Sequence, residues 1–480
     1  MKRNRDKLSL FTKISYGVGN LGYGALGQTI SSFIMFFGTS IMGISGSLVG
    51  ITIAIASLWD GASDPLVGHL SDHTKSKVFG RRLGHMLFAT FGLAICNILI
   101  WHYPDTNNEF LLSLWLLGFL ILIETFNTFF ATPYSALAID IAPDYNEQSN
   151  LQGFKSVFYI IGMILPGFLM YYFSSSVSLG IQTQFSKENY ISIAYVNSLL
   201  VLVCGLVCVF GCMRRVHKQN TKKVIEEKKE KKKFLKLIVG YFETLKKPNF
   251  SAIMLGYSAA QISTAFLTSV GMHLFTYCYH FSSTQISLLM MCLFGGAILS
   301  QLLWVYIVKL VDKKQALVFS LFVILLGISF ISITFIFRLY VPTNVMFYFV
   351  APCFLLCGVG SGAIYSLPVS MYADVVTLEQ FNTGENHAGT YSGYYTFTYN
   401  FSNSITLLFI GILLDFIKFD STEPVQALSV QSGLGLIVFL GCSIALTVSI
   451  LMFSKYKVKR SDVLKAQLKL KEKYQDEDNV

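Results

Sequence analysis

Three long stretches of this sequence contain no charged side chain, and they constrain the fold more than any other feature. Asp, Glu, Lys and Arg are all absent from residues 14–59, 248–308 and 339–373. A helix that crosses the hydrocarbon core of a bilayer needs about 20 mostly apolar residues. Each stretch is therefore long enough for at least one membrane span, and the longest is long enough for two. The chain is predicted to cross a membrane several times.

The composition argues against a soluble enzyme. Charged residues make up 13% of the 480 residues, against roughly 25% in a typical soluble domain. The aqueous segments that remain between the predicted spans are too short to fold a catalytic domain. The sequence also contains no nucleophile–base constellation and no phosphate-binding loop. We expect no enzymatic activity and no bound cofactor.

Twelve membrane spans account for the apolar pattern. Helices are the expected spanning element because lipid cannot satisfy open backbone hydrogen-bonding groups. The fold class is therefore predicted to be an all-α polytopic membrane protein with twelve transmembrane helices. The predicted spans are 14–39, 46–70, 84–102, 110–138, 153–173, 191–212, 249–277, 284–309, 315–336, 344–370, 389–414 and 431–453.

The distribution of positive charge predicts the orientation. With the N-terminus inside, 34 of the 37 Lys and Arg residues fall in inner segments, and the outer loops hold only Lys187, Arg338 and Lys418. Cytoplasmic loops of membrane proteins carry such an excess of positive charge. We therefore expect a multi-pass protein of the cell membrane with both termini in the cytoplasm. The net charge of +10 is scattered over juxtamembrane pieces, which does not favour nucleic acid as a partner.

The two halves of the chain share a short motif. "TPYSALAID" ends at Asp140, and "LPVSMYAD" ends at Asp374, each where a predicted helix reaches the cytoplasm. Two six-helix halves are typical of transporters built from repeats. The predicted parts are an N-terminal half (1–212), a basic linker (213–248), a C-terminal half (249–453) and a cytoplasmic tail (454–480). We expect the linker to be helical and to contact anionic lipid headgroups, and the tail to form a short amphipathic helix.

Two carboxylates in the predicted span 46–70 are the strongest functional signal. Asp60 and Asp64 lie four residues apart and therefore share one helix face. Charged side chains inside a membrane helix are costly and usually functional. Two carboxylates on one face can bind a hard cation such as Na⁺ as a metal site, or share a proton. The alternative is that they pack against a basic residue and have only a structural role.

Further polar residues can extend this site. Glu124 in the fourth predicted span is a third membrane carboxylate, and Ser63 offers a hydroxyl oxygen. Oxygen ligands of this kind suit hard ions. Three carboxylates around one cavity do not all ionise cheaply, which slightly favours H⁺ over Na⁺ as the coupling ion. A packing role for Glu124 stays open.

A short acid–base cluster follows the second predicted span. Asp72, Arg81 and Arg82 are spaced so that they can form a latch between helix ends at a cytoplasmic gate. The alternative is that the arginines only set the membrane topology. Lys155, at the start of the fifth predicted span, either neutralises the carboxylates or extends its ammonium group to the lipid headgroups. His273 is either a packing residue or part of a proton relay.

Several motifs resemble the glycoside–pentoside–hexuronide:cation symporter family of the major facilitator superfamily, of which the melibiose permease is the best-known type. The motifs are "YGVGNLGYGALG", "WDGASDPLVGHLSD", "TPYSALAIDIAPDYNEQSNLQGFK" and "GVGSGAIYSLPVSMYADVV". The resemblance covers essentially all twelve predicted spans. It implies the major facilitator fold and transport by alternating access. It also implies that Asp60 and Asp64 bind the coupling cation, and that Glu124 stands at another cation-site position.

The resemblance also implies a substrate site, with clear departures from the family. The residues at or near substrate positions are Tyr23, Asn127, Lys155, Tyr365 and Asn400. Gly24 stands where the melibiose permease has an acidic sugar ligand, and Ala131 stands where it has a tryptophan. A lysine that is common in the family aligns near Asn400. We therefore do not expect melibiose as the substrate. Animal relatives of this fold carry lysophospholipids, so the substrate need not be a sugar.

The predicted function is cation-coupled symport of a small solute, with a sugar, glycoside or uronate favoured. The aromatic stretch "YSGYYTFTYNFSN" can stack on a sugar ring, or it can serve only in packing. A carrier of amphiphilic lipids or drug-like solutes is the alternative, and a non-transporting membrane receptor is a remote one. The expected partners are a small-molecule substrate and membrane lipid, and we expect a monomer.

Overall fold

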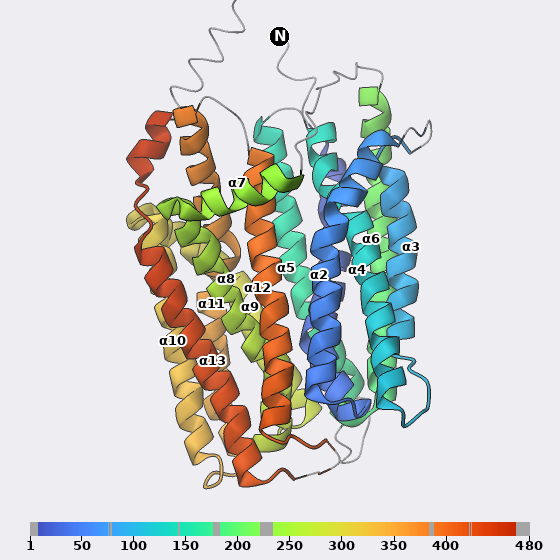
Figure 1. The fold of residues 1–480 in the computed structure, drawn as a ribbon, viewed down its shortest axis with the longest axis vertical. Helices are drawn as coiled ribbons and strands as arrows, with labels where there is room; N and C mark the ends of the chain where they lie inside the picture. The colour runs from blue at the N-terminus through green and yellow to red at the C-terminus, as the bar shows by residue number, and fades with distance from the viewer. Residues whose placement is uncertain are drawn as a thin grey trace, which may run out of the picture. The chain divides into compact units, whose positions relative to one another are not determined.

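The chain folds into helices, as its sequence predicts. The computed structural model describes residues 8–74, 76, 79–142, 145–175, 183–220, 234–383, 388–421, 423 and 425–466, and these contain α-, π- and 3-10 helices but no β-strand. Figure 1 shows the long helices and the short α7. The α-helices are α1 (Leu10–Phe36), α2 (Gly46–His73), α3 (Leu83–Ile100), α4 (Glu109–Ile141), α5 (Tyr145–Ser175), α6 (Lys187–Asn220), α7 (Phe234–Lys246), α8 (Pro248–His273), α9 (Ser283–Leu310), α10 (Lys313–Phe337), α11 (Thr343–Thr383), α12 (Ala388–Phe416) and α13 (Leu428–Ser454).

Twelve of these helices, all except α7, correspond to the twelve predicted spans. Within the described residues, 11 helices are long and apolar enough to cross a membrane. Helix α1 is not among the 11, because Gly, Ser, Thr, Asn and Gln replace apolar residues over much of its length. The predicted all-helical membrane fold is confirmed.

Several helices extend beyond the predicted membrane boundaries. Helix α11 ends at Thr383, beyond residue 370, where its predicted membrane span ends. The segment after Pro368 contains neither Gly nor Pro before α11 ends, so no residue that breaks helices stops it at the edge of the apolar stretch.

The chain packs as two compact units. Unit 1 consists of Met1–Glu227, Thr268–Phe294 and Leu407–Leu434. Unit 2 consists of Lys228–Leu267, Gly295–Thr406 and Gly435–Val480. The division into an N-terminal half, linker, C-terminal half and tail stays a prediction.

Glycines allow close helix packing within unit 1. Helix α1 packs against α5 and α6, while α4 packs against α2 and α3. A Cβ atom at Gly162 of α5 would lie 2.4 Å from the backbone oxygen of Leu21. Small residues let membrane helices approach until their backbones touch. This packing places the polar face of α1 beside α5, and places the acidic face of α2 beside α4.

Unit 2 uses the same device where α10 contacts α11. A Cβ atom at Gly360 would lie 2.7 Å from the backbone oxygen of Ser320. At Gly327, a Cβ atom would lie 3.1 Å from the backbone oxygen of Cys353. Larger side chains at these glycines would push the two helices apart.

The helices of the first and seventh predicted spans both end in a π-helical turn. These turns are η1 (Phe37–Ile41) and η3 (Leu274–Cys278), and both belong to unit 1. Thr39 Oγ1 lies 2.7 Å from Nε2 of His273, a fully buried residue at the end of α8. His273 is therefore a hydrogen-bonded residue between two helix ends. Its role as packing residue or proton relay stays open.

The basic linker contains α7, which supports the prediction of a helical linker. Figure 1 shows α7 lying crosswise to the long helices of unit 2. The ring of Tyr241 on α7 lies 5.6 Å from that of Tyr394 on α12. Just beyond α7, Lys247 forms an ion pair with Glu379 of α11. The charge run at 221–233 lies outside the described residues.

Candidate cation site and arginine pair

Helices α2 and α4 place a row of oxygen atoms between them. Thr128 Oγ1 donates a hydrogen bond of 3.0 Å to Asp60 Oδ1. One turn along, Thr132 Oγ1 donates a hydrogen bond of 2.9 Å to Asp64 Oδ1. Asp60 and Asp64 stand four apart on α2, and Thr128 and Thr132 stand four apart on α4, so the two helices meet in register. Each carboxylate therefore has a hydroxyl partner on the facing helix.

Ser63 belongs to the same row. Its side chain is buried, and its Oγ lies 2.9 Å from Thr128 Oγ1 and 3.0 Å from the backbone oxygen of Asp60. A hydroxyl has one hydrogen to donate and two lone pairs to accept. When Ser63 donates to Thr128, the hydroxyl hydrogen of Thr128 is left for Asp60. The three residues can thus form a directed chain of hydrogen bonds that ends on a carboxylate.

The threonines of α4 are not among the site residues predicted from the sequence. Thr125 accepts a hydrogen bond of 2.8 Å from the indole of Trp59, so it continues the row formed by Thr128 and Thr132. The available signal was the spacing of these three residues, which repeats every three or four positions on one helix face. A threonine in a helix often bonds only to its own backbone, which makes this signal weak without the facing helix.

Glu124 lies on the same helix as these threonines. Its Oε2 accepts a hydrogen bond of 3.2 Å from Asn127 Nδ2, and Asn127 also lies 3.4 Å from the hydroxyl of Tyr23. The backbone oxygen of Glu124 lies 3.0 Å from Thr128 Oγ1, which places Glu124 one turn along α4 from the row. Among the described residues, however, no three acidic, His or Cys side chains are close enough to hold a metal ion together. The local oxygen set is two carboxylates and several hydroxyls, with Glu124 beside it.

Three candidate substrate residues lie in unit 1 together with the carboxylates. Tyr23 contacts Asn127 as described, and its ring centroid lies 6.3 Å from that of Tyr159 on α5. Lys155 Nζ donates a hydrogen bond of 3.2 Å to Ser135 Oγ. The same ammonium group lies 5.1 Å from the ring centroid of Tyr134, a favourable cation–π distance. Within the described chain, Lys155 has no salt bridge to a carboxylate.

The other two candidate substrate residues lie in unit 2. Tyr365 is a partly exposed residue of α11, and Asn400 is a partly exposed residue of α12. The backbone oxygen of Asn400 accepts a hydrogen bond of 2.8 Å from Ser404. The assignment of these two residues to the substrate site stays a prediction.

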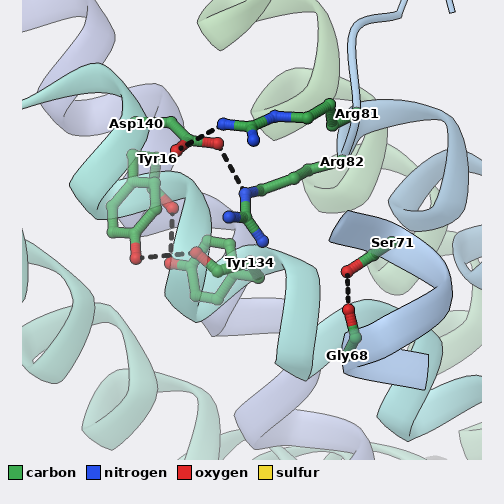
Figure 2. Close-up of polar contacts among 7 residues, drawn as sticks. All are labelled: Tyr16, Gly68, Ser71, Arg81, Arg82, Tyr134 and Asp140. Carbon is green, nitrogen blue, oxygen red and sulfur yellow. Dashed lines mark hydrogen bonds and ion pairs between the residues drawn. The ribbon is translucent and has the colours of Figure 1, made fainter. Parts of the chain in front are cut away.

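Arg81 and Arg82 both form ion pairs with an aspartate of α4. Arg81 lies 3.3 Å from Asp140 Oδ1, and Arg82 Nε lies 2.5 Å from Asp140 Oδ2. Figure 2 shows the two guanidinium groups reaching the same carboxylate. From their spacing, the arginines are expected to form a latch with Asp72, whose side chain lies outside the described residues. The partner shown by the structure is Asp140, the last residue of the motif "TPYSALAID".

The repeated motif has the same arrangement in unit 2. Asp374 Oδ2 accepts a hydrogen bond of 2.5 Å from Nζ of Lys313, the first residue of α10. In both units, a basic residue at the start of a helix or in the turn before it binds the aspartate that ends the shared motif. The short sequence similarity therefore corresponds to a shared contact, which supports an internal repeat.

Comparisons with known proteins identify the family. A family profile described as MFS/sugar transport protein matches residues 15–460. An uncharacterized symporter, sll1374, of Synechocystis is 30% identical over 201 residues, which are 41% of this chain and 37% of that protein. Sodium-dependent lysophosphatidylcholine symporter 1-A of Danio rerio is 22% identical over 100% of this chain and 92% of its own length.

Solved transporters share the fold. The xylose transporter XylE from E. coli gives a TM-score of 0.63 at 11% identity and covers 95% of this chain and 98% of its own. The nucleoside transporter NupG gives a TM-score of 0.61 at 11% identity, with 93% and 99% covered. These similarities confirm the predicted major facilitator fold. The chain belongs to the MFS/sugar transport family, and it is a multi-pass membrane transporter and not an enzyme.

Proposed function

We propose that this protein is a cation-coupled symporter whose coupling ion binds at Asp60 and Asp64. The observation that carries the proposal is the row of paired carboxylates and hydroxyls between α2 and α4. Bare carboxylates are costly at this depth in a membrane helix. A bound cation offsets that cost, and it favours the conformer in which the loaded site moves through the membrane.

Na⁺ fits the oxygen set better than H⁺ does. A proton on one carboxylate needs no further ligand, whereas Na⁺ can use the hydroxyl oxygens of Ser63, Thr128 and Thr132 together with the carboxylates. Several full-length relatives are named sodium-dependent symporters, which points the same way. The competing proposal is H⁺ coupling with Glu124 as a participant, because three neighbouring carboxylates do not all ionise cheaply.

The residues around Lys155 favour a solute that carries a negative group. Lys155 is held by Ser135 and the ring of Tyr134 and has no acidic partner in the described chain. Tyr23 and Asn127, which contact each other in the same unit, offer a hydroxyl and an amide. A uronate offers a carboxylate for the lysine and hydroxyls for the other two. We therefore favour a sugar, glycoside or uronate, with the uronate first.

An amphiphilic lipid is the second candidate solute. The relatives that align with 95–100% of this chain include lysophosphatidylcholine symporters of several vertebrates. The phosphate of such a lipid would also suit Lys155. A membrane receptor that binds the solute without moving it is the remaining alternative, and solute counterflow separates it from both transport proposals.

Uptake into proteoliposomes tests these proposals. Radiolabelled uronates, neutral glycosides and lysophosphatidylcholine are offered separately, while Na⁺ and pH gradients are imposed one at a time. Accumulation of a uronate driven by Na⁺ alone supports the proposal. Accumulation driven only by a pH gradient rejects Na⁺ coupling, and no accumulation or counterflow of any solute in the panel rejects the proposed substrate classes. Lys155→Gln should weaken uptake of the anionic solutes more than that of neutral ones.

We also propose the cellular arrangement predicted from the charges. The basic segments at both ends of the chain and in the linker place both termini in the cytoplasm of a cell-membrane protein. Extracellular protease should then leave an epitope tag at either terminus intact in whole cells and remove it from inverted vesicles. The protein is proposed to act as a monomer, because all residues of the candidate cation and substrate sites belong to one chain.

A further inference from the structure

A cavity in unit 2 lies apart from the candidate transport residues. Its volume is about 260 Å³, just below the range of about 300–1,000 Å³ typical of small-molecule sites. It lies where the end of α9, the start of α10, α11 and the C-terminal tail meet. The residues that line it are Val308, Lys309, Asp312, Lys313, Asp374, Tyr456, Val458, Lys459, Arg460, Val463 and Leu464.

The tail is fixed at this cavity by backbone contacts. Lys314 Nζ donates hydrogen bonds of 2.7 Å to the backbone oxygen of Ser454 and 2.8 Å to that of Tyr456. The backbone N–H of Lys457 donates a hydrogen bond of 3.0 Å to Asn249 Oδ1. Residues 460–466 are helical, and Val463 is buried. The tail is therefore held in one place, so its next basic residues line the cavity.

The lining carries excess positive charge. Lys313 is neutralised by Asp374, and Asp312 accepts a hydrogen bond of 2.7 Å from the backbone N–H of Lys313. Lys309, Lys459 and Arg460 form no salt bridge with any described residue. Four basic and two acidic side chains give the lining a net charge of +2. This arrangement leaves an arginine and two lysines ready for an anion.

The shape and place of the cavity narrow the choice of anion. Arg and Lys bind phosphate oxygens through charge-assisted hydrogen bonds. Val308, Val463 and Leu464 supply an apolar wall beside the basic groups. Basic pockets between membrane helices on the cytoplasmic side bind anionic lipid headgroups. A phosphate group at the level of the headgroups suits both the charge and the apolar wall.

We propose that this cavity is a binding site for a phosphate-bearing anion, held by Lys309, Lys459 and Arg460. The phosphate can belong to an anionic phospholipid or to a free phosphate ion, because both present the same oxygens. The bound anion would tie the C-terminal tail to α9 and stabilise unit 2. The site is independent of the coupling ion and of the transported solute.

Lipid binding to the purified full-length protein tests the proposal. Native mass spectrometry measures the binding of phosphatidylglycerol and of phosphatidylcholine, and thermal unfolding is followed in inorganic phosphate. The test variant is Lys459→Gln with Arg460→Gln. The matched control is Lys457→Gln with Lys465→Gln, which removes two exposed charges from the same tail outside the cavity lining. Unfolding temperatures without lipid or phosphate check that both variants are folded.

We expect the test variant alone to lose binding of phosphatidylglycerol. Phosphatidylglycerol should bind wild type and control alike and the test variant roughly 30-fold more weakly, because each basic side chain contributes near an anionic headgroup. Protection by inorganic phosphate, lost in the same variant, would identify a free ion as the ligand. Equal binding of phosphatidylglycerol and phosphatidylcholine together with no protection by phosphate, or equal loss in test and control variants, would overturn the proposal.

Discussion

Removal of the Arg82 charge should slow transport more than it weakens solute binding. The side chain of Arg82 is 11% exposed and lies 2.5 Å from Asp140, whereas that of Arg81 is 41% exposed and lies 3.3 Å away. Exposed ion pairs contribute about 0.2–1 kcal/mol, and loss of one partner of a buried pair costs about 3–5 kcal/mol. These limits place the Arg82 contact at about 2 kcal/mol and the Arg81 contact at about 0.5 kcal/mol.

We propose that the contact of Arg81 and Arg82 with Asp140 acts as a latch that holds one conformer, so its energy sets the equilibrium between conformers. If the contact exists in one conformer only, Arg82→Gln shifts the equilibrium between conformers by roughly 30-fold, and Arg81→Gln by roughly twofold. Turnover and the half-saturating solute concentration are measured in proteoliposomes for both variants, for Asp140→Asn and for the double variants. Arg82→Gln and Asp140→Asn should not add, because they remove the same contact.

Two results would refute the latch. A collapse of solute affinity with unchanged turnover would make the arginine a solute ligand. Lower thermal stability with turnover and affinity both unchanged would leave only a structural ion pair. An Arg81→Gln effect larger than that of Arg82→Gln would contradict the ranking taken from exposure and distance.

Three further predictions concern the site and the packing. Thr132→Val removes a hydroxyl oxygen that the proposed Na⁺ site uses, so the Na⁺ concentration for half-maximal uptake should rise; an unchanged value would exclude Thr132 from the ion site. Gly411→Ala places a Cβ 2.1 Å from the backbone oxygen of Gly46 and should lower thermal stability by about 1–3 kcal/mol, whereas Gly27→Ala, with no neighbour within 4 Å, should not; equal stability of the two variants would contradict the packing. Glu124→Thr should leave Na⁺-driven uptake largely intact if Na⁺ is the coupling ion, and loss of a pH-driven component instead would show that H⁺ is used.

The helices could be predicted from hydropathy, but their ends could not. Charge-free stretches mark where the chain contacts hydrocarbon, which is why the predicted spans agree with the described helices. A helix continues into water until a capping or breaking residue stops it. Helix α6 therefore runs to Asn220 and α11 to Thr383, beyond the apolar residues that define their spans.

The carboxylates could be found from sequence because their signal is local. Asp60 and Asp64 stand out by charge and by spacing on a single helix. Their partners Thr128 and Thr132 come from another helix and are ordinary residues for a membrane span. The partner of Arg81 and Arg82 was missed for the same reason, because Asp140 is nearly 60 positions away. Contacts between helices depend on packing that the sequence does not reveal directly.

The contacts of the aromatic stretch of α12 could not be predicted from the sequence either. Its composition favoured stacking against a sugar ring, with packing as the alternative. In the structure, Tyr395 stacks on Tyr257 of α8 with 5.1 Å between ring centroids, and Tyr394 contacts Tyr241 of α7. These rings pack against other helices of unit 2. Their spacing in sequence could not distinguish a ring that faces a neighbouring helix from one that faces a solute.

The most direct test of the proposed cation site is gradient-driven uptake by Asp64→Asn. The amide keeps an oxygen for Thr132 but removes the charge that balances the cation. Accumulation against a solute gradient should be abolished, while exchange of internal for external solute continues in part. Asp105→Asn, which removes an exposed loop carboxylate, should accumulate solute like the wild type. Undiminished gradient-driven accumulation by Asp64→Asn would contradict the assignment of the coupling ion to this site.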